Sequence, residues 1–143
     1  MKIKNMSANI PQIIGKDKLN REVKDLSSVN WWGMDRKEIS WYPTINYDKC
    51  MSCGICFITC GHRVFDWDTD NDLPIVAHPY NCMVACQTCA NLCPCGAIEF
   101  PEPREIKRMI AKAKVVKKAF DIMEPLKGKS SLSENETQTK PEI

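Results

Sequence analysis

Short apolar runs alternate with polar loops through the middle of this chain, and their lengths predict several short elements. Runs rich in β-branched and aromatic side chains predict strands at 44–47, 63–67, 74–78 and 97–100. Two further short stretches predict helices at 54–60 and 87–93. The acidic run DTDND, between the second and third strands, predicts the turn of a hairpin.

The flanking segments have a different pattern. In the N-terminal part, Asp17 is a candidate cap for a short helix with Leu19, Val23 and Leu26 on one face. Composition divides the chain into an extension at 1–40, a central domain at 41–103, a helix at 104–124 and a tail at 125–143.

The segment 104–124 repeats its apolar residues at intervals of three and four, which predicts one amphipathic helix with a basic polar face. The apolar positions are Ile106, Met109, Ile110, Ala113, Val116, Phe120 and Met123. Beyond Pro125 the sequence is polar and has no periodicity, so we predict that the tail is disordered.

Four aromatic residues stand close to the start of the central domain, namely Trp31, Trp32, Trp41 and Tyr42. If exposed, they would mark a surface for a partner protein. If packed, they would cover one flank of the domain and shield its interior from water. We favour packing, because aromatic side chains are the largest source of burial that so small a domain can recruit.

Charge is distributed unevenly along the chain. Residues 41–103 carry two basic and seven acidic side chains, a net charge of −5, whereas 1–40 carry +3 and 104–124 carry +4. The basic helix either neutralises the acidic domain, which we favour, or docks on an acidic partner protein. No base-reading motif accompanies it, so we expect no nucleic-acid partner. No apolar run approaches the roughly 20 residues of a membrane span, so we expect no transmembrane segment.

The candidate chemistry lies in the cysteines, eight of which form two arrays. The arrays are Cys50-x2-Cys53-x2-Cys56-x3-Cys60 and Cys82-x3-Cys86-x2-Cys89-x3-Cys93-Pro94. Two sets of four thiolates are the ligand supply for two [4Fe–4S] clusters. A disulfide framework would require a secreted chain, yet the first ten residues contain no apolar stretch long enough for a signal peptide, so we expect a cytoplasmic protein. Zinc ribbons use paired Cys-x2-Cys knuckles, which these triplets fit poorly.

The stretches INYDKCMSCGICFITC and CQTCANLCPCGAIEF resemble those of bacterial-type ferredoxins with two [4Fe–4S] clusters. The resemblance covers about residues 44–100 and implies an α+β fold, with a ferredoxin-like, pseudo-twofold βαββαβ dicluster core and, here, flanking helical extensions. It also implies that each cluster takes its fourth ligand from the opposite array. Cluster 1 is then held by Cys50, Cys53, Cys56 and Cys93, and cluster 2 by Cys82, Cys86, Cys89 and Cys60.

The sequence departs from the family pattern at two places. Gly61 stands where a proline is expected after Cys60, and either residue ends a helix. The Cys82-x3-Cys86 spacing is one residue longer than usual and, with the next cysteine, matches radical S-adenosylmethionine enzymes. The 50 residues after Cys93 are too few for the barrel of such an enzyme, and Cys60 is available as a fourth ligand.

Cys95 is the ninth cysteine, and it is left over once eight ligands are counted. It could replace a ligand or respond to oxidation. It could also be a small, buried side chain near the cluster, which is the role that unligated cysteines commonly have. We favour the packing role.

The resemblance implies electron transfer, in an electron-transfer subunit of a larger oxidoreductase or in a carrier to one. An iron–sulfur redox sensor or regulatory protein is the alternative. The sequence offers no catalytic constellation, since neither His62 nor His78 is visibly paired with a serine or a free cysteine. We therefore expect a non-catalytic electron-transfer protein whose partners are a redox enzyme or other subunits of an oxidoreductase complex. The long extensions favour the subunit slightly.

Overall fold

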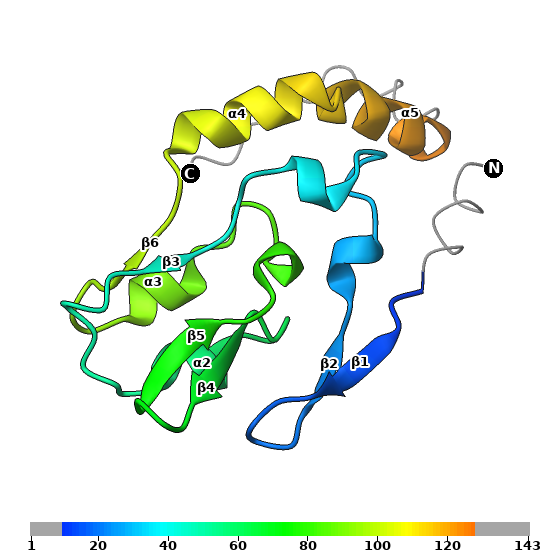
Figure 1. The fold of residues 1–143 in the computed structure, drawn as a ribbon. Coiled ribbons are helices and arrows are strands. Elements are labelled where there is room, and N and C mark those ends of the chain that lie inside the picture. The colour runs from blue at the N-terminus through cyan, green and yellow to red at the C-terminus, as the bar shows by residue number, and fades with distance from the viewer. Residues whose placement is uncertain (1–9, 128–143) are drawn as a thin grey trace.

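The computed structural model describes residues 10–127 of the chain (Figure 1). The elements of the central domain are, in chain order, β3 (Thr44–Ile45), α2 (Ile55–Thr59), β4 (Phe65–Asp68), β5 (Leu73–Val76), α3 (Thr88–Leu92) and β6 (Ile98–Glu99). Each overlaps the range that the sequence predicts for it. The α+β class is therefore confirmed for this domain.

The strands of the central domain form two antiparallel pairs. β3 pairs with β6, which brings the two ends of the domain together. β4 and β5 form the predicted hairpin, with Phe65 opposite Val76. The carboxylate of Asp68 accepts hydrogen bonds from the backbone N–H groups of Asp70 at 3.0 Å and Asn71 at 3.3 Å, and these bonds close the acidic turn.

The hydrophobic core combines the central domain with the end of the N-terminal extension. Its buried members are Ile39, Trp41, Cys56, Phe57, Val64, Phe65, Cys82 and Ile98. The ring of Trp41 stacks on Phe100 with the two centroids 5.0 Å apart, and Tyr42 meets Tyr80 edge to face. Trp41 is only 1% exposed, whereas Trp32 is 36% exposed. The packing role predicted for the aromatic residues is thus confirmed for Trp41 and is wrong for Trp32.

The helix predicted around Asp17 is wrong. The extension forms an antiparallel hairpin of β1 (Ile13–Lys16) and β2 (Glu22–Lys24), followed by the 3-10 turns η1 (Leu26–Ser28) and η2 (Arg36–Glu38). The Asp17 carboxylate accepts hydrogen bonds from the N–H groups of Leu19 and Arg21, each at 2.9 Å, and such local bonds compete with helix formation. Val23 is buried and Leu19 is 51% exposed, so they do not share one apolar face.

Arg21 joins this hairpin to the central domain. Its guanidinium donates hydrogen bonds to the carbonyl oxygens of Phe57 and Ile58, both at 2.9 Å, and lies over the Phe57 ring. The last carbonyls of a helix have no partner inside the helix, so Arg21 satisfies two of them in α2. The charge of Arg21 is balanced by Asp17, whose Oδ2 lies 2.8 Å from Arg21 Nε.

The single helix predicted over 104–124 is two helices, α4 (Pro103–Lys112) and α5 (Val115–Lys127). Lys114 lies between them with a φ of 53°, a left-handed conformation that ends the first helix. Ile106 and Met109 of α4 pack against the core, whereas no residue of α5 is buried, and its Val116 and Phe120 are more than half exposed. α5 extends past the predicted end at 124, and the rest of the predicted tail, 128–143, lies outside the described residues.

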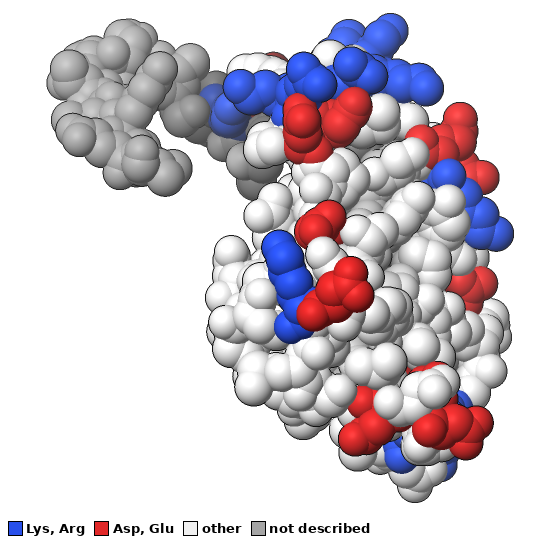
Figure 2. Space-filling view, turned by 60° about the vertical axis from the view of Figure 1, so that its left-hand side comes forward, with Lys and Arg blue, Asp and Glu red and all other residues white. Residues whose placement is uncertain are grey.

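Basic side chains gather in one region of the surface, whereas acidic side chains are scattered over the visible face. Lysine and arginine side chains gather over α4 and α5 at the top of Figure 2, and several acidic side chains lie at the opposite end. Within residues 10–127, no helix is long and apolar enough to cross a membrane.

Candidate functional site

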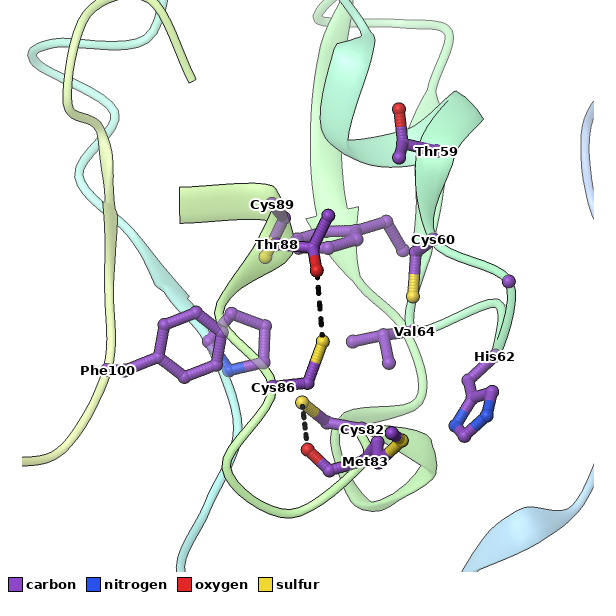
Figure 3. Close-up of a pocket in the computed structure, with 13 residues that line it drawn as sticks. Thr59, Cys60, His62, Val64, Cys82, Met83, Cys86, Thr88, Cys89 and Phe100 are labelled. Carbon is purple, nitrogen blue, oxygen red and sulfur yellow. Dashed lines mark hydrogen bonds between the residues drawn. The ribbon is translucent and has the colours of Figure 1, made fainter. Parts of the chain in front are cut away.

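Four of the predicted ligands line one cavity of about 150 Å³, which we call the Cys82 cavity. Cys82 and Cys86 follow the turn η3 (Pro79–Asn81), Cys89 lies in α3, and Cys60 follows the last residue of α2. Figure 3 shows the four side chains arranged around the same space, although they come from separate segments of the chain. These are the four cysteines predicted for cluster 2.

The other four predicted ligands line a smaller cavity of about 20 Å³, which we call the Cys50 cavity. They are Cys50, Cys53, Cys56 and Cys93. Apolar side chains, including Ile45, Pro74 and Ile98, form much of the remaining wall. This cavity therefore contains the set predicted for cluster 1, again with three cysteines from one array and one from the other.

The cysteine that completes each cavity stands at the end of a short helix. The N–H of Cys60 donates to the carbonyl of Cys56 at 3.2 Å, and the N–H of Cys93 donates to the carbonyl of Cys89 at 3.0 Å. Both residues then leave the helix with extended backbone. Because α2 and α3 lie against each other, each terminal cysteine is positioned at the cavity of the opposite array.

The two cysteine loops share one backbone conformation although their lengths differ. The residue just before the second cysteine is left-handed in both loops, with a φ of 60° at Ser52 and 76° at Ala85. The N–H of Cys86 also donates to the carbonyl of Met83 at 2.9 Å, which closes a turn within the longer loop. The additional residue is therefore taken up between Cys82 and Ala85, and Cys82 still lines the cavity.

The protonation of the buried cysteines follows from their surroundings. Burial, and beyond it the charge of neighbouring cysteines, raises the pKa of Cys82 and Cys89 to about 12. Burial likewise raises the pKa of Cys56 to about 11. Buried thiols of this kind hold their protons at pH 7, and a metal bound there would supply the positive charge that favours the thiolate form.

The donor set fits iron–sulfur clusters. Each cavity offers four soft sulfur donors, and thiolates are the ligands that such clusters take. In the described part of the chain, no group of three histidine, cysteine, aspartate or glutamate side chains could hold a single metal ion. The radical-enzyme alternative needs an iron that no cysteine binds, whereas Cys60 gives the Cys82 cavity a fourth thiol.

Cys95 lies at the Cys50 cavity as a fifth sulfur. Its Sγ is 3.7 Å from the Sγ of Cys93, which also accepts a hydrogen bond from the N–H of Ala97 at 3.3 Å. Burial opposes ionisation of Cys93, but backbone hydrogen bonds to its sulfur outweigh burial and lower its pKa. Burial and the contact with Cys93 raise the pKa of Cys95. Of this pair, Cys93 is therefore the better thiolate ligand.

Several side chains outside the cavity hold the loop that carries Cys82 and Cys86. Trp41 donates from its Nε1 to the carbonyl of Cys86 at 3.2 Å. Arg36, only 4% exposed, donates from Nε and Nη2 to the carbonyl of Cys82 at 3.2 and 2.8 Å. The side chain of Asn81 bonds to two backbone groups near η1. The packing of Trp41 was predicted from the sequence, whereas Arg36 was missed, because no sequence signal separates it from the other basic residues of the extension.

Comparison with known proteins identifies the family. No protein-family model matches the chain. A ferredoxin of Methanocaldococcus jannaschii that is itself uncharacterised is 39% identical, over 54% of this chain and 52% of that protein. Ferredoxin-3 of a Nostoc species is 36% identical, over 38% of this chain and 76% of the relative. The chain belongs to the ferredoxin family.

Membership of the ferredoxin family implies that the chain holds an iron–sulfur cluster. This ferredoxin also matches a longer protein, the NAD-dependent dihydropyrimidine dehydrogenase subunit PreA of Escherichia coli, at 40% identity over 48% of the chain and 17% of PreA. The chain thus spans about half the length of the archaeal relative and a smaller share of PreA.

Proposed function

We propose that this ferredoxin transfers electrons through two [4Fe–4S] clusters held in the Cys50 and Cys82 cavities. Cys50, Cys53, Cys56 and Cys93 would hold cluster 1, and Cys82, Cys86, Cys89 and Cys60 would hold cluster 2. The observation that carries the proposal is the division of eight cysteines into two sets of four, each around its own cavity. Such clusters accept and release single electrons at potentials that the protein sets through charge, hydrogen bonds and solvent exposure.

The residues of the chain have distinct roles in this proposal. The left-handed residues Ser52 and Ala85 turn each loop so that its cysteines face one cavity. The backbone N–H groups of Ser52 and Ala97 donate to the sulfurs of Cys50 at 3.5 Å and Cys93 at 3.3 Å. Hydrogen bonds to a sulfur favour its negatively charged form. These contacts therefore stabilise the thiolates that the cluster requires.

The structure contains features suited to passing electrons from one cavity to the other. The helices that separate the cavities, α2 and α3, are in direct contact. Cys56 of α2 and Cys89 of α3 are close enough for the charge of Cys56 to affect the pKa of Cys89. Cys60 and Cys93 connect the backbone of each array with the cavity of the other. We infer that an electron passes between two neighbouring centres inside one chain.

We further propose that the protein works as an electron-transfer subunit of a larger oxidoreductase, or as a carrier to one. The match to part of PreA, a dehydrogenase subunit, supports the subunit role. The exposed apolar side chains of α5, Val116 and Phe120, give this ferredoxin a surface beyond its cysteine domain that could contact another protein. Purification of the native protein under anaerobic conditions tests this role: a fixed subunit would elute with one large enzyme, and a carrier would elute alone.

Iron and acid-labile sulfide analysis of the anaerobically purified full chain tests the cluster content. Eight ligands predict about eight irons and eight sulfides per chain. A value of about four irons, or zinc in place of iron, would contradict the two-cluster proposal. The Cys95→Ala variant is the matched control, since it removes a cysteine outside the ligand set and should retain the full iron content.

A further inference from the structure

Arg36 has an unusual environment for a charged residue. Its guanidinium lies in the core at 4% exposure, with its carbon Cζ 5.6 Å from the centre of the Tyr80 ring. It donates hydrogen bonds to the carbonyl oxygens of Ile39, Trp41 and Cys82. All of these partners are uncharged. None of the ion pairs found among residues 10–127 involves Arg36.

A buried cation without an anionic partner is costly, because hydrogen bonds to carbonyls replace only part of its hydration. The fold nevertheless places this cation against the backbone of Cys82, a proposed ligand. In the holo-protein four thiolates outnumber the positive charges of the oxidised cluster core, so the site as a whole is anionic. Arg36 has no negatively charged partner within the described part of the polypeptide. A cluster bound in the Cys82 cavity would therefore supply this missing counter-charge.

A second arginine also lies near the Cys82 cavity, which makes the two cavities differ in their positive charge. Arg63 donates from Nη1 to the carbonyl of Cys60 at 3.1 Å, and its buried Nε has no hydrogen-bond partner. Arg63 is partly exposed, so its charge is screened more than that of Arg36. Two ligand residues of the Cys82 cavity thus accept hydrogen bonds from arginine. Within residues 10–127, no bond of this kind reaches the carbonyls of the four ligand residues of the Cys50 cavity.

We propose that Arg36 is a fixed buried counter-charge for the cluster of the Cys82 cavity and makes that cluster easier to reduce than the one in the Cys50 cavity. This inference rests on the two-cluster function proposed above. Reduction adds one negative charge to a cluster, and a nearby positive charge in a medium of low dielectric stabilises the more negative form. Because Arg36 belongs to the extension, a segment outside the cysteine arrays would set the order in which the two clusters accept electrons.

The test is a redox titration of the anaerobic full-length holo-protein, followed by electron paramagnetic resonance, for wild type and Arg36→Met. We expect Arg36→Met to lower one of the two midpoint potentials by at least about 59 mV, a tenfold change in a one-electron equilibrium, and to move the other by much less. Cys82→Ser assigns the signal, because a ligand change perturbs its own cluster, and both variants should move the same potential. Arg36→Lys keeps the charge and should restore most of the shift.

Arg21 provides the matched control. It too is an arginine of the extension that bonds to carbonyls of the central domain, but its charge is balanced by Asp17. Arg21→Met combined with Asp17→Asn removes both charges together, and this double variant should therefore leave both potentials nearly unchanged. If Arg36→Met does not retain its clusters, Arg36→Gln and Arg36→Lys replace it, and the lower potential is expected in the glutamine variant.

The outcomes separate this inference from the proposed function. Two clusters whose potentials are the same in wild type and Arg36→Met, or that shift equally, would overturn the role of Arg36 and leave the two-cluster function standing. If the glutamine and lysine variants have the same pair of midpoint potentials, the role of Arg36 is likewise overturned while the two-cluster function stands. A wild-type iron content of about four per chain would contradict the proposed function itself, before any potential is measured.

Discussion

The two cavities are built from similar loops but are enclosed differently. The Cys50 cavity is lined by the central domain alone, by its cysteine loops together with strand residues such as Ile45 and Ile98. The Cys82 cavity is also lined by the central domain, but the backbone of its ligand loop is held from outside by Trp41 and by the buried charge of Arg36 from the extension. Local sequence thus gives both sites their ligand geometry, and a segment without any cysteine gives them different electrostatic surroundings. Two similar sites become distinct through what packs on them.

Loss of a terminal cysteine should have the largest effect and should break the cavity of the opposite array. Cys60→Ala is expected to remove or damage the cluster of the Cys82 cavity and to leave about four irons per chain in the other. Iron analysis with electron paramagnetic resonance measures this. Damage confined to the cluster of Cys50, Cys53 and Cys56 would contradict the claim that Cys60 binds the cluster of the other array.

Cys93→Ala is the corresponding variant for the Cys50 cavity. The sulfur of Cys95 lies next to that of Cys93 and could take its place as a ligand. The variant is therefore best compared with Cys93→Ala combined with Cys95→Ala. We expect the double variant to lose the cluster of the Cys50 cavity. Cys95→Ala alone should keep both clusters.

Removal of the Trp41 side chain should destabilise the Cys82 cavity selectively, because Trp41 holds the backbone of Cys86. Truncation of a large buried aromatic side chain costs about 3–5 kcal/mol, so Trp41→Ala should release the cluster of the Cys82 cavity at markedly lower denaturant concentration. Trp41→Phe should cost less, about 1 kcal/mol for the lost hydrogen bond to Cys86 in addition to a small packing defect. Trp32→Ala is the exposed control, expected to change stability by less than about 0.5 kcal/mol. Equal effects of Trp41→Ala and Trp32→Ala would contradict this supporting role of Trp41.

The Asp17–Arg21 pair should contribute less, because it anchors the hairpin rather than the core. Asp17→Asn leaves Arg21 without its counter-charge and is expected to destabilise the fold by about 1–3 kcal/mol. Burial alone would raise the pKa of Asp17, but hydrogen bonds from Arg21 and Leu19 outweigh it and hold the pKa below its ordinary value of 3.8. A lowered carboxyl pKa contributes stability that is complete above the ordinary value and is lost only as pH falls through the lowered one. The cost of Asp17→Asn, measured by denaturant midpoints, should therefore be the same at pH 6 and pH 9.

The smallest effect concerns the two left-handed loop residues. Glycine adopts this conformation without the penalty that a Cβ atom brings, so Ala85→Gly should stabilise the holo-protein by about 0.5–1 kcal/mol. Ser52→Gly is the counterpart in the other loop and should have a similar effect. Thermal release of the clusters is the measurement. Destabilisation by both substitutions would show that the side chains contribute more than the strain costs.

The sequence predicted the central domain well, because short apolar runs and regular cysteine spacing are local signals. All four strands and both short helices of the domain occur within a few residues of their predicted positions. The N-terminal prediction failed because Leu19, Val23 and Leu26 have helical spacing, whereas the hydrogen bonds of Asp17 favour a turn. The break at Lys114 was not predictable either, since lysine carries no signal for left-handed backbone.

The candidate site also has one part that the sequence predicted and one part that it did not. The cysteines and their grouping came from spacing and family resemblance, and the structure brings each set of four to one cavity. The support of the loop that carries Cys82 and Cys86 depends on contacts between residues more than 40 positions apart, such as Arg36 with Cys82 and Trp41 with Cys86. Contacts of this kind follow from tertiary packing, which no local pattern in a single sequence encodes.

The central claim is that two clusters lie close together in one chain, each ligated by cysteines of both arrays. Electron paramagnetic resonance of the fully reduced, anaerobic protein tests it most directly, because neighbouring paramagnetic clusters broaden and split each other's signals. For the wild-type protein we predict two spins per chain with a coupled line shape. For Cys60→Ala we predict only one spin per chain, with a simple line shape. One uncoupled spin per chain in the wild-type protein, at full iron occupancy of its sites, would contradict the account.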